Sequence, residues 1–239
     1  MSSDIVGGTV SASGAGAPTA LRDWITTNPR NTAIHDHGFT LNTGWWNDRI
    51  VGLPGAPIAG GSRSAHITRA DLFAMADRAL ADGTGTGALQ LLWHTLVWGS
   101  GSDHRRDPRR IASIRENPEE LGKLLRDAAE RVRTDVREAF LMLKPGRPAI
   151  KFLGPNFFTK FLYFAGGGDP THRALIVDRR VRETLHRVTG HDTFRAQGNY
   201  RSSSYLASIE TMEEWAADVS SPQRRVAADE VERWAFSAR

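Results

Sequence analysis

The chain has 239 residues, of which 40% are hydrophobic and 24% charged, a balance typical of a globular protein with a substantial core. It contains no cysteine, which excludes disulfides, thiol catalysis and cysteine-ligated zinc or iron–sulfur sites. No apolar run approaches the roughly 20 residues that span a bilayer, and the first residues lack the pattern of a secretory signal. We therefore expect a monomeric cytoplasmic protein that contacts no membrane and carries no cofactor.

In chain order, residues 1–17 read as a disordered tail and residues 28–66, rich in Gly, Pro, Asn and His, as an irregular segment. Apolar periodicity and capping signals then predict a series of helices. The expected ranges are 68–81, 87–98, 117–143, 155–165, 179–189, 202–216 and 222–236. Only residues 174–177 resemble a strand. The sequence thus predicts an all-α fold, with residues 18–239 forming one domain.

The basic residues outnumber the acidic ones by 31 to 27, and only four of them are lysines. Arginine forks match phosphate geometry and stack on bases, so this surface is compatible with nucleic acid, although coding bias can also enrich arginine. The run from His104 to Arg110 is a candidate phosphate-binding patch, in which Arg105, Arg106 and Arg109 are the expected contacts. A solvated loop is the alternative.

The most informative segment is residues 150–190. Lys160 lies among aromatic and aliphatic residues, so burial would disfavour its ammonium form and make a neutral amine nucleophile available. Asp178 follows an apolar run and precedes a predicted helix. Taken singly, Lys160 could extend its ammonium to water and Asp178 could be only a helix cap.

Taken together, the two residues carry a resemblance. The run Gly-Pro-Asn-Phe-Phe-Thr-Lys-Phe-Leu-Tyr-Phe at 154–164, with Val-Asp at 177–178, resembles the helix-hairpin-helix DNA glycosylases. Within them it is similar to a bacterial branch of the 8-oxoguanine DNA glycosylase fold, most sharply over residues 152–181. The stretch 153–158 lacks the second glycine of the usual Leu-Pro-Gly-Val-Gly hairpin.

This resemblance implies two helical lobes around a DNA cleft, with residues 150–190 forming the catalytic hairpin region. It also implies a double-stranded DNA partner that contains a modified base, with 8-oxoguanine as the first expectation. Lys160 would attack C1′ of the deoxyribose, and Asp178 would act as its electrostatic and acid/base partner. Attack by a lysine further implies that cleavage at the resulting abasic site could accompany base removal.

A base that leaves the duplex normally enters a pocket with aromatic walls. The candidates for these walls or for DNA contacts are Trp45, Trp46, Trp93, Trp98, Phe157, Phe158 and Trp234. Trp45 and Trp46 differ from the others because they lie in a polar segment. We interpret His94 as a hydrogen-bonded core histidine, and His35 and His37 as loop histidines without a metal.

Other functions remain open. The polar 28–66 segment, with Asn47, Asp48 and Arg49, could read a larger base that carries hydroxyl groups. An anti-phage glycosylase that removes glucosylated hydroxymethylcytosine is therefore an alternative to a repair enzyme. A non-catalytic helix-hairpin-helix DNA-binding protein would need neither Lys160 nor Asp178. A toxin-like or other all-α protein with a structural lysine is the remaining alternative.

Overall fold

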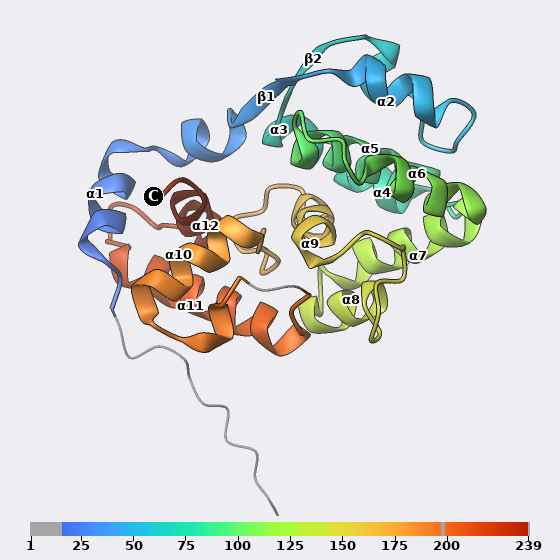
Figure 1. Cartoon of the computed structure of the whole chain (residues 1–239). Helices are drawn as coiled ribbons and strands as arrows, with labels where there is room; N and C mark the ends of the chain where they lie inside the picture. Colours follow the sequence, from blue (N-terminus) through green and yellow to red (C-terminus); the bar gives the residue numbers. More distant parts are fainter. Residues whose placement is uncertain (1–15, 197–198, 239) are drawn as a thin grey trace, which may run out of the picture.

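The computed structural model describes residues 16–196 and 199–238, so most of the predicted 1–17 tail lies outside the described residues. The all-α prediction is confirmed, since helices account for most of the described chain (Figure 1). The α-helices are α1 (Thr19–Thr27), α2 (Thr43–Ile50), α3 (Arg69–Phe73), α4 (Ala76–Ala81), α5 (Thr86–Ser100), α6 (Asp107–Glu116), α7 (Pro118–Arg131), α8 (Val136–Leu143), α9 (Pro155–Phe164), α10 (Arg179–Thr189), α11 (Ser202–Val219) and α12 (Ala228–Ser237). Short helices of other types are η1 (Asn31–His35), η2 (Ile58–Gly61) and η3 (Asp192–Phe194).

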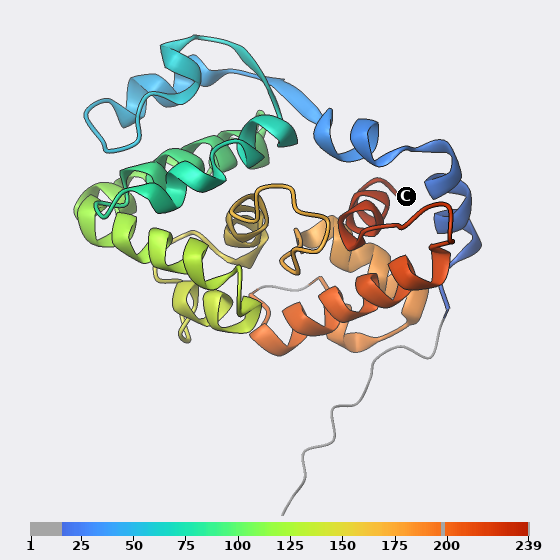
Figure 2. The ribbon, with the colours of Figure 1, turned by 180° about the vertical axis from the view of Figure 1, so that it is seen from behind.

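The helices form two groups on either side of α9 (Figures 1 and 2). One group contains α3 to α8, in which α5 packs against α4, α7 and α9. The other contains α10, α11 and α12, and α1 joins it by packing against α12. Helix α9 also reaches the second group, because the hydroxyl of its Tyr163 donates to Asp229 of α12 at 3.1 Å. The central helix is therefore held from both sides.

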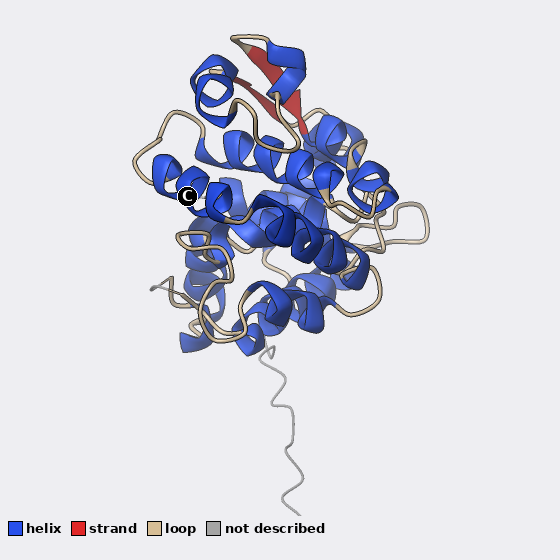
Figure 3. Ribbon diagram, turned by 90° about the vertical axis from the view of Figure 1, so that its right-hand side faces the viewer, coloured by secondary structure: helices blue, strands red, loops and turns tan. Residues whose placement is uncertain are grey.

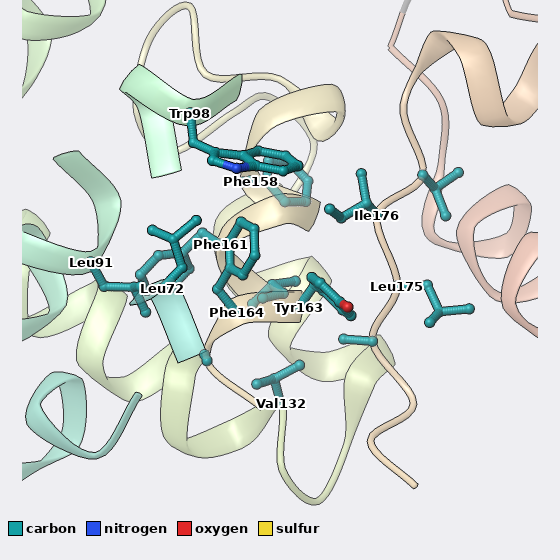
Figure 4. Close-up of a cluster of buried hydrophobic side chains, with 14 of the residues drawn as sticks. Leu72, Leu91, Trp98, Val132, Phe158, Phe161, Tyr163, Phe164, Leu175 and Ile176 are labelled. Atoms are coloured by element: carbon teal, nitrogen blue, oxygen red, sulfur yellow. The ribbon is translucent and has the colours of Figure 1, made fainter. Parts of the chain in front are cut away.

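The hydrophobic core is built around α9 (Figure 4). Its side chains Phe158, Phe161 and Phe164 are at most 1% exposed, and they meet apolar residues of α5 and of the segment that precedes α10. Complete burial of one such side chain contributes about 1.5–3 kcal/mol. Because α9 carries the candidate nucleophile, the hydrophobic core also fixes the position of that residue.

The prediction that residues 28–66 are irregular is wrong. They contain η1, α2, η2 and an antiparallel pair of strands, β1 (Gly38–Leu41) and β2 (Ala65–Thr68), which Figure 3 shows in red. Phe39 pairs with Ile67 in this sheet, and Asn42 caps α2 by accepting a hydrogen bond from the backbone of Trp45 at 3.1 Å. Strands of four residues are too short to show alternation among so many turn-forming residues.

Four further predictions need correction. The helix expected at 68–81 is interrupted by a turn after Phe73, so α3 and α4 are separate helices. The helix expected at 117–143 is divided, because Asp135 caps α8 and accepts a hydrogen bond from the backbone N–H of Glu138 at 2.9 Å. The helix expected at 222–236 begins only at Ala228, after a turn in which Ser221 and Arg224 bond each other. The strand-like run at 174–177 pairs with no strand in the described chain.

Across residues 16–196 and 199–238, no helix has the length and apolar character needed to cross a membrane.

Candidate active site

Asp178 is placed by an extended, fully buried segment. Residues 174–177 are at most 1% exposed, and side chains satisfy their backbone groups in place of a neighbouring strand. Tyr200 donates to the carbonyl of Val177 at 2.5 Å, and Tyr205 donates to that of Leu175 at 3.2 Å. At the end of this segment, Oδ1 of Asp178 caps α10 by accepting from the backbone of Arg180 and Val181 at 3.0 and 3.2 Å.

The second carboxylate oxygen of Asp178 is left to meet Lys160. Lys160 Nζ lies 2.9 Å from Asp178 Oδ2, and it also donates to the carbonyl of Asn156, one turn earlier on α9, at 3.0 Å. Only 7% of the lysine side chain and 13% of the aspartate side chain are exposed. The two residues singled out in the sequence are thus brought into direct contact in a nearly closed environment.

The contact changes what burial alone would do. The amine of Lys160 is buried, as expected from the sequence, but a carboxylate oxygen lies 2.9 Å from it, so each group has the other as its partner. A hydrogen bond of this length is also a path for a proton from the amine to the carboxylate. Formation of the neutral amine can therefore be coupled to protonation of Asp178, a possibility that sequence reasoning about burial alone could not reveal.

Space for the lysine side chain comes from a glycine. A Cβ built on Gly99 would lie 3.1 Å from Cδ of Lys160 and 3.3 Å from the ring of Phe157. The predicted helix at 87–98 ended one residue before Gly99, whereas α5 runs through Gly99 to Ser100. Gly99 was therefore not recognised as part of the site, because its role depends on a contact between α5 and α9.

A cavity of about 650 Å³ lies at the N-terminus of α9. Among the described residues, four arginines and no acidic residue line it; the arginines are Arg106, Arg110, Arg179 and Arg182. Phe157, half-buried, forms part of the same wall and lies 5.8 Å from Lys160 Nζ, measured to the ring centroid. Helix N-termini and arginines both favour anions, so this cavity is suited to a phosphate group.

Arg110 fixes the geometry of this wall. Its guanidinium stacks on Phe157, with Cζ 3.7 Å from the ring centroid, and bonds the buried carboxylate of Asp107 at 2.6 Å. It also donates to the carbonyl of Phe152 at 3.1 Å. Phe152 is 47% exposed and has a φ of 66°, a left-handed conformation that is uncommon outside glycine. Arg110 lies in the predicted phosphate-binding patch but was not among its expected contacts, and nothing local in the sequence marks Phe152.

The predicted DNA contacts differ in their positions. Arg106 lines the cavity. Arg109 Cζ lies 5.6 Å from the ring centroid of Phe152, which also lines the cavity. Arg105 is exposed and paired with Asp103 at 2.7 Å. The patch is also not a loop throughout, because α6 begins at Asp107.

The predicted aromatic contacts divide into core and surface. Trp46, Trp93, Phe158, Trp98 and Trp234 are each at most 5% exposed, so in this structure they serve mainly as packing residues. These five rings are therefore not accessible as walls of a base pocket, although Trp98 lies at the margin of the core. Trp45 is half-buried: its ring stacks on His104 with centroids 4.1 Å apart, and Arg49 lies over it at 4.0 Å.

The interpretation of His94 as a core histidine is confirmed. Its Nδ1 contacts the carbonyl of Gln90 at 2.8 Å, and Nε2 accepts from the backbone of Ala59 at 3.1 Å, so the ring is neutral. Burial lowers the pKa of His94 accordingly. Within the described residues no group of three or more His, Cys, Asp or Glu is arranged to hold a metal ion. His35 instead lies 2.9 Å from Arg30.

The fold is helical, and it places a buried lysine and an aspartate in direct contact. Both features agree with the class of DNA glycosylases that the motif at 152–181 resembles. The chain belongs to the family OGG, described as "Putative 8-oxoguanine DNA glycosylase OGG-like protein", whose model matches residues 32–236. Neither the curated proteins nor the solved structures searched gave a match. At the level of class, therefore, the chain is a DNA glycosylase whose substrate is DNA.

Proposed function

We propose that the protein excises 8-oxoguanine from double-stranded DNA, with Lys160 as the nucleophile and Asp178 as its acid/base partner. The observation that carries this proposal is the 2.9 Å contact between Lys160 Nζ and Asp178 Oδ2 in a nearly closed site. Family membership supports the class of reaction, and the description of the family supports the choice of base.

In the proposed reaction the lysine proton first moves to Asp178 along their hydrogen bond. The free electron pair on Nζ then forms a bond to C1′ of the extruded nucleotide while the bond from C1′ to the base nitrogen breaks. The base leaves with the electron pair of the broken bond to C1′ and takes up a proton, for which protonated Asp178 is the nearest source. The carboxylate so formed can stabilise the positive charge that develops at C1′.

A lysine bonded to C1′ also permits cleavage of the DNA strand. The C1′–O4′ bond of the sugar ring then breaks while a proton passes from Nζ to O4′. This leaves a protonated Schiff base between Nζ and C1′, which makes the protons on C2′ acidic. Loss of one such proton expels the 3′ phosphate by β-elimination, and water then hydrolyses the imine and frees the lysine. The arginine-lined cavity beside Phe157 would hold a backbone phosphate during these steps.

The experiment is base release and strand cleavage under single-turnover conditions, on duplexes with one 8-oxoguanine. Lys160→Gln should abolish cleavage, and Asp178→Asn should slow base release by roughly 10²–10⁴-fold, the range of a positioned acid/base group. Lys123→Gln, at an exposed lysine of α7, is the matched control and should behave as wild type. Normal cleavage by Lys160→Gln would rule out the proposed nucleophile.

The alternative substrate, glucosylated hydroxymethylcytosine in phage DNA, is tested in the same assay. Asn47, one of the polar residues that suggested this substrate, already has its hydrogen-bond partners within the protein. Its amide donates to the carbonyls of Ile58 and Ser62 and accepts from the backbone N–H of Ile58. Release of the glucosylated base without release of 8-oxoguanine would replace repair by defence and leave the roles of Lys160 and Asp178 unchanged.

A further inference from the structure

A second group of side chains lies beside the catalytic pair, on elements distant in the sequence. It consists of His37, which directly precedes β1, Phe39 of β1, Trp98 of α5, and Arg233 and Phe236 of α12, and we call it the His37 cluster. Its rings touch in series: His37 lies 5.5 Å from Trp98 and 6.4 Å from Phe236, and Phe39 lies 5.3 Å from Trp98. The elements that contribute it come together next to α9 (Figure 1).

The cluster is connected to the catalytic pair on two sides. Trp98 is followed by Gly99, whose α-carbon faces the Lys160 side chain. Asp178 caps Arg180, and the guanidinium of Arg180 lies 4.9 Å from the ring centroid of Phe236. Phe39 is 37% exposed, and His37 and Phe236 are half-buried, so part of the cluster is open to solvent.

The side chains of this cluster present hydrogen-bond donors without acceptors. Nε and Nη1 of Arg233 and Nε1 of Trp98 are buried, and they have no partner within the part of the chain that the structure describes. Glu232, the neighbouring acid, does not serve them, because both its oxygens accept from Arg69 at 2.8 and 3.3 Å. Buried donors of this kind normally have an acceptor, so an acceptor from outside the chain would complete the cluster.

His37 adds a donor whose position is fixed by its neighbour. Arg69 Nε donates to His37 Nδ1 at 3.3 Å, and an arginine cannot accept, so Nδ1 carries no proton. Burial, with Arg69 and Arg233 acting in the same direction, lowers the pKa of His37 to about 3. The ring is therefore neutral at pH 7, and its single N–H is at Nε2.

We propose that the His37 cluster reads the extruded base and selects one with carbonyl oxygens on the edge that Arg233 contacts. This inference rests on the proposed function, because it assumes that a nucleotide is bound at Lys160. The accessible rings of Phe39 and Phe236 provide stacking surfaces, and the donors match the O6 edge of guanine-type bases. Adenine and cytosine present an amino group at the corresponding position, which would face the arginine donors and leave them unpaired.

The test compares 8-oxoguanine with 8-oxoadenine, which differ at C6 and also in the 2-amino group and the N1 proton that only the guanine carries. Single-turnover release is measured from duplexes with 8-oxoguanine or 8-oxoadenine, which share the 8-oxo group but carry a carbonyl or an amino group at C6. We expect release of 8-oxoguanine to be about 10–100-fold faster, the discrimination of one well-placed pair of hydrogen bonds. Arg233→Met should remove most of this preference by slowing release of 8-oxoguanine.

Two further variants separate the roles of charge and geometry. Arg233→Lys retains the charge but loses the planar fork, so it should also weaken the preference, and it guards against a folding defect in Arg233→Met. Arg180→Met is the matched control, because the guanidinium of Arg180 is exposed and lies near the Phe236 ring, as that of Arg233 does. It should weaken binding to all duplexes alike and keep the base preference.

An abasic duplex distinguishes failure of this inference from failure of the proposed function. Borohydride trapping at an abasic site requires the lysine but no base, so Arg233→Met should reduce it far less than it reduces base release. A wild-type protein without preference for 8-oxoguanine, or folded Arg233 variants that keep the preference, would overturn the inference. Release of glucosylated hydroxymethylcytosine alone would overturn it too, while trapping at the abasic site would still support Lys160.

Discussion

The contact between Lys160 and Asp178 predicts an asymmetric loss of stability. Asp178→Asn keeps a side-chain oxygen that can cap α10 but removes the charge that balances the buried ammonium. Breaking a buried ion pair in this way costs about 3–5 kcal/mol, and we expect the lower end because 13% of the aspartate side chain is exposed. For a chain of this length, about 3 kcal/mol lowers the Tm by roughly 6–12 °C.

Lys160→Met should cost less. The carboxylate that remains still accepts two backbone hydrogen bonds at the start of α10, so it is not left without partners. A loss of about 1–2 kcal/mol is expected, and the double variant should be more stable than the sum of the two single losses predicts. The difference, about 2 kcal/mol, is the coupling energy of the pair.

Urea unfolding of the wild type, the two single variants and the double variant measures this coupling energy. The cycle requires that all four proteins unfold with the same dependence on urea concentration. A coupling energy below about 0.5 kcal/mol is within ordinary additivity and would show that the two groups do not interact in solution. The proton path that the proposed mechanism requires would then be absent.

Further outcomes follow from the same geometry. Gly99→Val should displace the Lys160 side chain and slow base release by about 10²-fold. A binding titration should show that the variant retains the DNA affinity of the wild type. Arg106→Ala should weaken binding of any duplex, and should reduce the slope of log K against log salt by about 1. The pKa of about 3 for His37, set by burial and by Arg69 and Arg233, lies below the value near 6.5 in the unfolded chain. Unfolding therefore takes up a proton below pH 6.5, so the free energy of unfolding decreases as the pH is lowered. The decrease at pH 5 is at most about 2 kcal/mol, and solvent screening of the half-buried ring makes it smaller. His37→Gln should flatten this decline in a urea series at pH 7 and pH 5.

The sequence was most informative where one local pattern carried the information. The aromatic helix around Lys160 and the aspartate at a helix start were visible without a structure, and the resemblance connected them. The division between α7 and α8 was harder to predict, because Val132 continues the apolar stripe across the break. Only Asp135, as the cap of α8, indicated it.

The His37 cluster could not have been predicted at all. Its members come from β1, α5 and α12, and no spacing in the sequence relates His37 to Arg233. The expectation for residues 28–66 failed for a related reason: the strand that carries Phe39 is defined by its pairing with β2, and not by its own composition. Local signals therefore located the proposed chemistry, while the proposed base recognition depends on tertiary contacts.

The most direct test of the account is to identify the residue that becomes bonded to DNA. Wild-type protein is reduced with borohydride in the presence of an 8-oxoguanine duplex, and the adduct is digested with trypsin and nuclease for mass spectrometry. The account predicts the sugar remnant on Lys160, in a peptide covering residues 152–173 because trypsin does not cut at a modified lysine. A remnant on Lys123, Lys144 or Lys151, or on the N-terminal amine, would contradict it.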